Sequence, residues 1–248
     1  MLSDEELDRY QRHIVLKEVG GRGQAALKAA TVAVIGAGGL GSPCLQYLAA
    51  AGVGQITIID DDAVSLSNLQ RQVLFGTDDV GRPKVEAAAE RLQALNPHVV
   101  VEALPVRLTA ETAASLLSQH DVVADGCDNF RTRDAVNRAC VALGIPLVSA
   151  AIGPFEGQLG VFAGHLPDAP CYACYAGVPE DVPGTSCADV GVLGTVAGLI
   201  GAAQALEVLR LITGFGESRV GRLWLYEGLG VEARSIRVGK DPKCPVCC

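Results

Sequence analysis

Residues 31–41 read TVAVIGAGGLG, and this stretch decides the fold. It opens with a β-branched apolar run, which is typical of a buried strand. The run leads into a Gly-x-Gly-x-x-Gly pattern formed by Gly36, Gly38 and Gly41. Between a strand and a helix, this pattern predicts a turn whose backbone N–H groups bind phosphate at the helix N-terminus. Gly36 would permit the turn, and Gly38 and Gly39 would let the backbone approach the phosphate closely.

The segments on both sides of the glycine pattern alternate between strands and helices. We expect strands at 32–35, 56–60, 99–104, 122–125 and 147–151, and helices at 3–30, 40–51, 84–95, 110–117, 131–143 and 192–213. This βαβα alternation predicts an α/β fold with a Rossmann-like, doubly wound, mainly parallel sheet. Strands expected at 157–162, 223–226 and 232–238 have no βα units between them, although a Pro/Gly-rich stretch and the helix at 192–213 separate the first two. These strands would extend the sheet in an antiparallel sense. We expect one domain with N-terminal helices in 1–30, nucleotide-binding βα units in 31–152 and an extension in 153–248.

Composition and charge narrow the functional classes. The chain is 49% hydrophobic but only 4% aromatic, with a formal net charge of −8. Such a charge argues against a nucleic-acid partner bound through a basic surface. The N-terminus shows no basic, apolar leader, so we expect a cytoplasmic protein. The apolar segment 190–212 carries Gln204, Glu207 and Arg210, which favours a buried helix over a membrane span.

The loop after the second expected strand carries polar and cationic residues that distinguish two kinds of nucleotide. Asp60 ends that strand, where a carboxylate can accept hydrogen bonds from ribose hydroxyls. Asn68, Arg71 and Lys84 follow on the loop. Backbone amides suffice for the pyrophosphate of a dinucleotide, whereas a triphosphate brings more charge for an Arg fork and a Lys point charge. ATP is therefore favoured; an NAD(P)-dependent oxidoreductase and a nucleotide-binding scaffold without turnover remain alternatives.

Several motifs stand in an order that resembles one known family. They are RYQRHIVL from residue 9, GAGGLGSP from 36, DDDAVSLSNLQRQ from 60, GRPKVEAA from 81, DGCDNFRTR from 125, CYAC from 171 and CPVCC from 244. The chain resembles the E1-like adenylyltransferases that activate sulfur carriers, and the likeness covers nearly its whole length. A related branch that dehydrates a modified tRNA base fits less well, because the chain is acidic and has both Cys-x-x-Cys pairs.

The resemblance implies a role for individual residues. Asp60 would hold the ribose of ATP, and the phosphates would be lined by Ser67, Asn68, Arg71 and Lys84. Arg12 is matched to an arginine that reaches the ATP of a neighbouring subunit, which implies a homodimer.

Asp128 is matched to the carboxylate that organises Mg²⁺, with Asn129 beside it at the nucleotide. It follows the expected strand 122–125, so it should emerge at the carboxyl edge of the sheet, where ligands bind. Its alternative role is to cap the following helix. Asp125 is the competing carboxylate, but we expect it to lie too deep.

The resemblance also implies the reaction and the partners. A small ubiquitin-like sulfur carrier would offer its C-terminal Gly-Gly carboxylate to ATP, giving an acyl-adenylate and pyrophosphate. A separate persulfide donor would then convert the adenylate to a thiocarboxylate. The small subunit of molybdopterin synthase, in molybdenum cofactor biosynthesis, is the favoured carrier, and the carrier of thiamine thiazole synthesis is the alternative. We expect no nucleic acid or membrane as a partner.

Two cysteine pairs have the spacing of a four-thiolate zinc site. Cys171 and Cys174 form the first pair, and Cys244 and Cys247 form the second. Because the pairs lie far apart in the chain, one structural zinc per chain would tie the C-terminus to the body. Redox disulfides are the alternative, and Cys248 is a rival to Cys247.

Cys187 lies in the Gly/Pro-rich stretch before the last expected helix, whose N-terminus could lower its pKa. In the family, a cysteine here can attack the activated carrier or form an acyl disulfide with it. The alternative is a cysteine without a chemical role.

Overall fold

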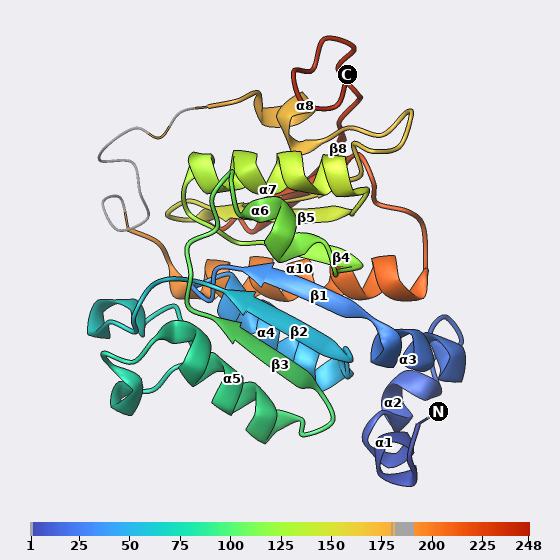
Figure 1. The fold of residues 1–248 in the computed structure, drawn as a ribbon, viewed down its shortest axis with the longest axis vertical. Helices are drawn as coiled ribbons and strands as arrows, with labels where there is room; N and C mark the ends of the chain where they lie inside the picture. Colours follow the sequence, from blue (N-terminus) through green and yellow to red (C-terminus); the bar gives the residue numbers. More distant parts are fainter. Residues whose placement is uncertain (1, 180, 182–190) are drawn as a thin grey trace.

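The sheet is the frame of the molecule (Figure 1). The computed structural model describes residues 2–179, 181 and 191–248. Within them, eight strands form one sheet in the order β3-β2-β1-β4-β5-β6-β7-β8. Their bounds are β1 (Thr31–Ile35), β2 (Gln55–Ile59), β3 (Val100–Leu104), β4 (Val122–Asp125), β5 (Leu147–Ile152), β6 (Glu156–Phe162), β7 (Arg222–Glu227) and β8 (Glu232–Arg237).

The type of strand pairing changes once across the sheet. Neighbours from β3 to β5 are parallel, and neighbours from β5 to β8 are antiparallel. The prediction of a doubly wound, mainly parallel sheet with an antiparallel C-terminal extension is confirmed. Parallel neighbours need crossover connections, whereas antiparallel neighbours can be joined by short turns, as β5–β6 and β7–β8 are. This explains the change of rhythm after residue 152.

The helices lie close to their predicted positions. They are α1 (Asp4–Arg9), α2 (Gln11–Ile14), α3 (Gly20–Ala29), α4 (Gly41–Ala51), α5 (Lys84–Leu95), α6 (Ala113–Leu117), α7 (Phe130–Leu143), α8 (Tyr172–Ala176) and α10 (Gly194–Thr213), with 3₁₀ turns η1 (Leu66–Asn68) and η2 (Thr77–Asp79). The expected helix over 3–30 is divided into three. One cause is Gly20, whose positive φ of 60° breaks the helical path before α3.

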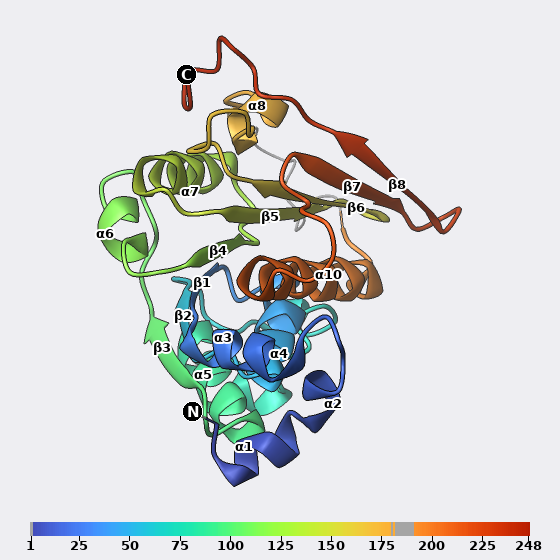
Figure 2. The same cartoon turned by 90° about the vertical axis from the view of Figure 1, so that its right-hand side faces the viewer.

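Helices cover both faces of the sheet (Figure 2). Leu45 of α4, Val85 of α5 and Ile200 of α10 belong to the apolar core on one face. Leu117 of α6 and Val136 of α7 belong to a second core on the other face. Alternate side chains of the central strands therefore enter two separate cores, which is why those strands are apolar throughout.

Helix α10 is long and apolar enough to cross a membrane by composition. In this fold it packs against α4, β5 and β6. The side chain of Gln204 is fully buried and donates to the carbonyls of Asp125 and Val148, at 2.9 and 3.0 Å. These contacts make α10 a packed helix beside the sheet, as predicted, although Leu199 and Leu206 remain exposed.

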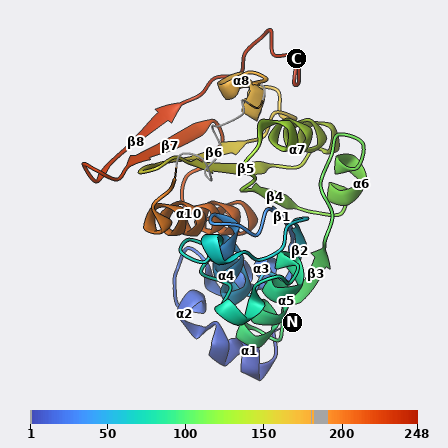
Figure 3. The ribbon, with the colours of Figure 1, turned by 90° about the vertical axis from the view of Figure 1, so that its left-hand side faces the viewer.

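The connectivity brings the loops after β1, β2 and β4 together at the carboxyl end of the parallel strands. From β1 the chain goes to β2 on one side, whereas β4 leads to β5 on the other. The strand order therefore reverses between β1 and β4, and the crevice outside the carboxyl ends of such strands is the usual ligand site. Figure 3 shows the antiparallel half of the sheet, in which β6, β7 and β8 lie in this order out to the last strand.

Candidate functional site

The glycine loop between β1 and α4 has the predicted strand–turn–helix geometry. Gly36 has φ +88°, which favours glycine. A Cβ on Gly41 would lie 1.9 Å from the Gly36 carbonyl oxygen, so a side chain there is excluded. A Cβ on Gly38 would contact only Gln72 Nε2 among the described residues, at 3.6 Å. Among the described residues, the N–H groups of Gly38 and Gly39 have no hydrogen-bond acceptor, so they are available to a phosphate.

Asp60 lies directly beside the glycine loop. Its carboxylate accepts a hydrogen bond from Ala37 N at 2.7 Å and from Asp62 N at 2.8 Å. Lys84 Nζ lies 3.9 Å from Asp60 Oδ2 and 2.6 Å from Asp62 Oδ2. Burial raises the pKa of Asp60, against the opposing effects of Lys84 and the two backbone N–H groups. The fold thus brings Asp60 and Lys84 together at one side of the loop.

Arg71 lies against Gly39 of the glycine loop. A Cβ on Gly39 would be 3.4 Å from Arg71 Cγ. The guanidinium donates to Asn68 Oδ1 at 2.9 Å and to the carbonyl of Ser67 at 3.4 Å. The turn η1 therefore brings Ser67, Asn68 and Arg71 into one group, while Ser67 itself is exposed.

Gln72 is a polar residue at this loop that the sequence analysis did not single out. It is 4% exposed, and within the described residues its Oε1 has no hydrogen-bond partner. It closes the SNLQRQ motif beside Arg71. Its place in this motif could have marked it as a candidate ligand-binding residue, because a side-chain amide buried next to a glycine loop can donate to a ligand.

Asp128 and Asn129 follow β4, as predicted. Asp128 is exposed, and within the described residues its side chain forms no ion pair and one hydrogen bond, with Asn129 Nδ2 at 3.5 Å. Asn129, not Asp128, is the N-cap of α7, since its side chain accepts from Thr132 N at 2.8 Å. Capping as the role of Asp128 is therefore wrong. Asp125 is fully buried and paired with Arg133, so the expectation that it lies too deep is confirmed.

Arg12 does not join the other predicted phosphate ligands within one chain. It is exposed on α2, which packs on α3 near the start of β1 (Figure 1). Arg71 and Lys84 follow the carboxyl end of β2. Its role across a subunit boundary stays a prediction.

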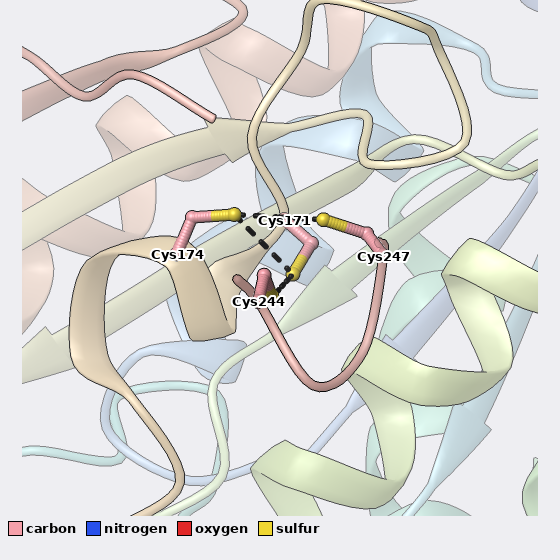
Figure 4. Close-up of side chains that lie close together, drawn as sticks. All are labelled: Cys171, Cys174, Cys244 and Cys247. Atoms are coloured by element: carbon pink, nitrogen blue, oxygen red, sulfur yellow. Dashed lines mark hydrogen bonds between the residues drawn. The ribbon is translucent and has the colours of Figure 1, made fainter. Parts of the chain in front are cut away.

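The two cysteine pairs come together near the C-terminus (Figure 4). The sulfur–sulfur distances are 3.6 Å for Cys171–Cys244, 3.5 Å for Cys174–Cys247 and 3.9 Å for Cys171–Cys174. A tetrahedron of zinc–sulfur bonds of about 2.3 Å has edges of about 3.8 Å. Cys248 is exposed, and its thiol lies 3.0 Å from the carbonyl of Asp241, away from the cluster. The four thiols can therefore hold one tetrahedral metal ion.

Within this cysteine cluster, the thiols of Cys171, Cys244 and Cys247 have shifted pKa values. Burial alone would raise the pKa of Cys244, but the backbone N–H groups of Cys247 and Val246 lower it to about 7. Burial raises the pKa of Cys171. Because the cluster includes one readily ionised thiol, a cation could bind it with release of protons. Cys187 lies outside the described residues.

A groove of about 590 Å³ runs over the antiparallel half of the sheet. Its lining includes Gly153, Gln158, Leu225, Glu232 and Arg234, from the segment after β5 and from β6, β7 and β8. The hydroxyl of Tyr175, on α8, donates to Gln158 Oε1 at 2.8 Å at this face. The groove is open to a chain in extended conformation, because it follows strands rather than a closed cavity.

Comparisons with known proteins agree with this geometry. Residues 10–246 match the ThiF family. The chain is 50% identical over 250 residues to the sulfur carrier protein adenylyltransferase of Thermus thermophilus, covering 98% of this chain and 91% of the relative. It is 39% identical over 246 residues to the molybdopterin-synthase adenylyltransferase of Escherichia coli, covering 99% and 98%. A crystal structure of E. coli MccB with ATP is similar, with a TM-score of 0.84 and 25% identity over 97% of this chain and 74% of that chain.

Proposed function

Because the chain belongs to the ThiF family and is an adenylyltransferase, we propose that it uses ATP to adenylate the C-terminal carboxylate of a small sulfur-carrier protein. One observation carries the proposal. The loop N–H groups of Gly38 and Gly39 are unpaired among the described residues, Arg71 lies against Gly39, and Asp60, which is near Lys84, accepts from the adjacent Ala37 N–H. An acidic chain has thus gathered cationic groups where a triphosphate needs them.

The chemistry follows from positioning and charge. A terminal carboxylate is already ionised near neutral pH, so it needs no general base to attack the α-phosphate. Its oxygen forms the bond to phosphorus while the bond to the leaving pyrophosphate breaks. Arg71 and Lys84 balance the negative charge that develops on the phosphate oxygens, and Asp60 binds the ribose.

Asp128 is the residue that we propose to hold Mg²⁺. It suits the ion, because it is an exposed carboxylate beyond β4 that forms no ion pair among the described residues. Magnesium usually takes one or two carboxylates together with phosphate oxygens and water. When bound, the ion would neutralise phosphate charge, and Asn129 would lie beside the nucleotide.

The carrier would dock on the extension at 153–248. We place its tail in the groove over β5 to β8, because an extended, thin Gly-Gly segment fits a surface that follows strands. Molybdopterin synthesis is the favoured pathway, since the chain spans nearly all of a relative named for it. The thiamine thiazole carrier is the alternative, and the sulfur would come from a separate persulfide donor.

The cysteine cluster would hold one structural zinc ion. Four thiolates leave no open position on the metal, so its role is to tie the C-terminal tail to α8. Free thiolates persist in reducing compartments, which fits the expected cytoplasmic location.

A homodimer would complete the site. An apolar groove of about 340 Å³ lies between the N-terminal helices and α10, with Leu16, Val19 and Leu206 in its lining. His13, in the same groove, follows Arg12 directly. A second copy seated there would therefore meet Arg12, as the predicted role of that residue requires. Mixed dimers of Arg12→Ala and Arg71→Ala subunits should regain activity that neither variant has alone; equally inactive mixtures would contradict the shared site.

Carrier-dependent exchange of labelled pyrophosphate into ATP tests the reaction. We expect exchange with a Gly-Gly-ended carrier, and loss of at least about 100-fold in Asp128→Ala. Asp168→Ala, which changes an exposed loop aspartate, is the matched control. Exchange that survives Asp128→Ala would remove this residue from the mechanism. Thermal protection by NAD rather than by ATP with Mg²⁺ would favour the oxidoreductase alternative.

A further inference from the structure

A buried ion pair lies directly beneath the loop that carries Asp128. Asp125 ends β4 with a fully buried side chain, and the Arg133 side chain, in the first turn of α7, is 5% exposed. Arg133 Nη1 lies 2.9 Å from Asp125 Oδ2. Burial opposes the charge on Arg133, but Asp125 raises its pKa above the usual value, so the guanidinium stays charged.

The guanidinium also holds the backbone of that loop. Arg133 Nη2 donates to the carbonyl of Cys127 at 2.6 Å and to that of Ala150 at 3.0 Å, while Nη1 donates to Ser149 Oγ at 2.5 Å. The backbone N–H of Cys127 in turn donates to Asp125 Oδ1 at 3.0 Å. Both backbone polar groups of Cys127, the residue before Asp128, are therefore bound by this one ion pair.

The Tyr172 ring also contacts the Arg133 guanidinium. The guanidinium carbon lies 5.4 Å from the centroid of the Tyr172 ring, a cation–π distance. Tyr172 N donates to Asn137 Oδ1 at 2.9 Å, one turn further along α7. The tyrosine follows Cys171, so the cysteine cluster and the Asp128 loop are connected through a continuous set of contacts.

Stability alone gives no reason for this arrangement. A buried ion pair is often no more stable than apolar side chains of similar volume. Asp128, by contrast, has no ion pair of its own among the described residues, so its position depends on the backbone before it.

We propose that Arg133 is a positioning residue for the adenylation, which binds the Cys127 carbonyl and so fixes Asp128 beyond the end of β4. This inference rests on the proposed function, in which Asp128 acts at the nucleotide. A misplacement of about 1 Å at a reacting centre can cost about 100-fold in rate, so the loop geometry matters to turnover.

Arg133→Lys is the decisive variant, because lysine keeps the charge beside Asp125 but cannot fork to several acceptors. Arg138→Lys is the matched control, since Arg138 is exposed on the same helix and pairs only with Asp134 among the described residues. We expect kcat of pyrophosphate exchange to fall about 10- to 100-fold in Arg133→Lys. The KM for ATP should change much less, and the control should match the wild type.

Two further readouts separate positioning from a merely structural role. Amide hydrogen exchange at residues 126–129 should be at least about 10-fold faster in Arg133→Lys than in the control. In an Asp128→Asn background, Arg133→Lys should lower the residual rate no further, because both act through one carboxylate.

Specific results would overturn the proposal. They are unchanged loop exchange and kcat in Arg133→Lys, or additive losses in the double variant. Should the variant not fold, wild-type amides at 126–129 that exchange as fast as an exposed loop would also refute the contact. A wild type without carrier-dependent exchange would instead refute the proposed function, even where Arg133 still slows loop exchange.

Discussion

Lys84 shows how one buried cation can serve both the fold and a ligand. Its side chain is 5% exposed and lies between Asp60 and Asp62. A buried lysine is tolerated because it is paired, and a triphosphate would offer it further acceptors. Arg71 differs, because its guanidinium is half-buried and is oriented by Asn68 within its own turn.

We predict that Lys84→Met lowers pyrophosphate exchange by at least about 100-fold, the cost of losing one preorganised charge. It also leaves Asp60 buried without its cation, so the pKa of Asp60 should rise further and ATP binding should weaken at mildly acidic pH. Exchange rates and calorimetric ATP titrations at several pH values measure both effects. Lys17→Met, on an exposed lysine, should behave as the wild type.

At the scale of elements, the glycine loop and α4 form one unit in which each glycine has a different task. Gly41 allows the helix to start against the Gly36 carbonyl, whereas Gly38 faces open space apart from Gln72. Glycine at 41 is therefore required by packing within the fold, whereas glycine at 38 leaves space for a ligand.

Two alanine substitutions should separate these tasks. Gly41→Ala places Cβ 1.9 Å from a backbone oxygen, so we expect a loss of stability of about 1–3 kcal/mol or more. Gly38→Ala meets no atom of the described residues closer than 3.6 Å, so the fold should keep its unfolding midpoint while ATP binding weakens at least about 10-fold. Urea unfolding and calorimetry measure the two. Full ATP affinity in Gly38→Ala would contradict phosphate binding at this loop.

Helix α1 has a pH-sensitive N-terminus. Ser3 and Glu6 form a capping box, and Glu6 Oε2 lies 2.6 Å from Lys28 Nζ of α3. Burial alone would raise the pKa of Glu6, but Lys28 and Ser3 lower it from 4.5 to about 2. The folded pKa is below the unfolded one, so this stabilisation is present above pH 4.5 and is lost as the pH falls toward 2.

We therefore expect Glu6→Gln to be about 1–3 kcal/mol less stable than the wild type at pH 7, with a smaller loss on acidification. Urea unfolding at a series of pH values between 7 and 2 measures the difference. Asp8→Asn, on the exposed face of the same helix, is the control. Parallel pH profiles for Glu6→Gln and the wild type would disprove the assignment.

At the scale of the whole molecule, the cysteine cluster joins α8 to the C-terminal tail. The tail follows β8, whose residues are all exposed, so few apolar contacts hold this end of the chain. A metal ion would supply what packing does not.

We predict about one zinc per chain in the wild type and loss of the metal in Cys171→Ser. Loss of the zinc should lower the unfolding temperature by at least about 5 °C, which corresponds to about 2 kcal/mol of stability in a chain of this size. Metal analysis and calorimetry measure both, and Cys248→Ser should keep the metal. Full zinc content in Cys171→Ser would exclude the four-thiolate site.

Local pattern was enough to predict the sheet, the glycine turn and the cysteine pairs. The apolar run before Gly36 specifies a strand, and positive φ at that position suits glycine, so both depend on neighbours in the chain. The strand at 122–125 was likewise predicted at its observed bounds, and the one predicted at 157–162 begins one residue earlier, at Glu156. Strand periodicity and turn chemistry act over a few residues, and this is why they can be read before folding.

Contacts between distant segments could not be read in this way. No spacing rule joins Gln72 to Gly38, or Arg133 to the carbonyls of Cys127 and Ala150. The choice of Asn129 over Asp128 as the cap also depends on the backbone path out of β4. Burial, ion pairing and the unpaired Oε1 atom of Gln72 arise when segments far apart in the chain become neighbours, so they exist only in the folded molecule.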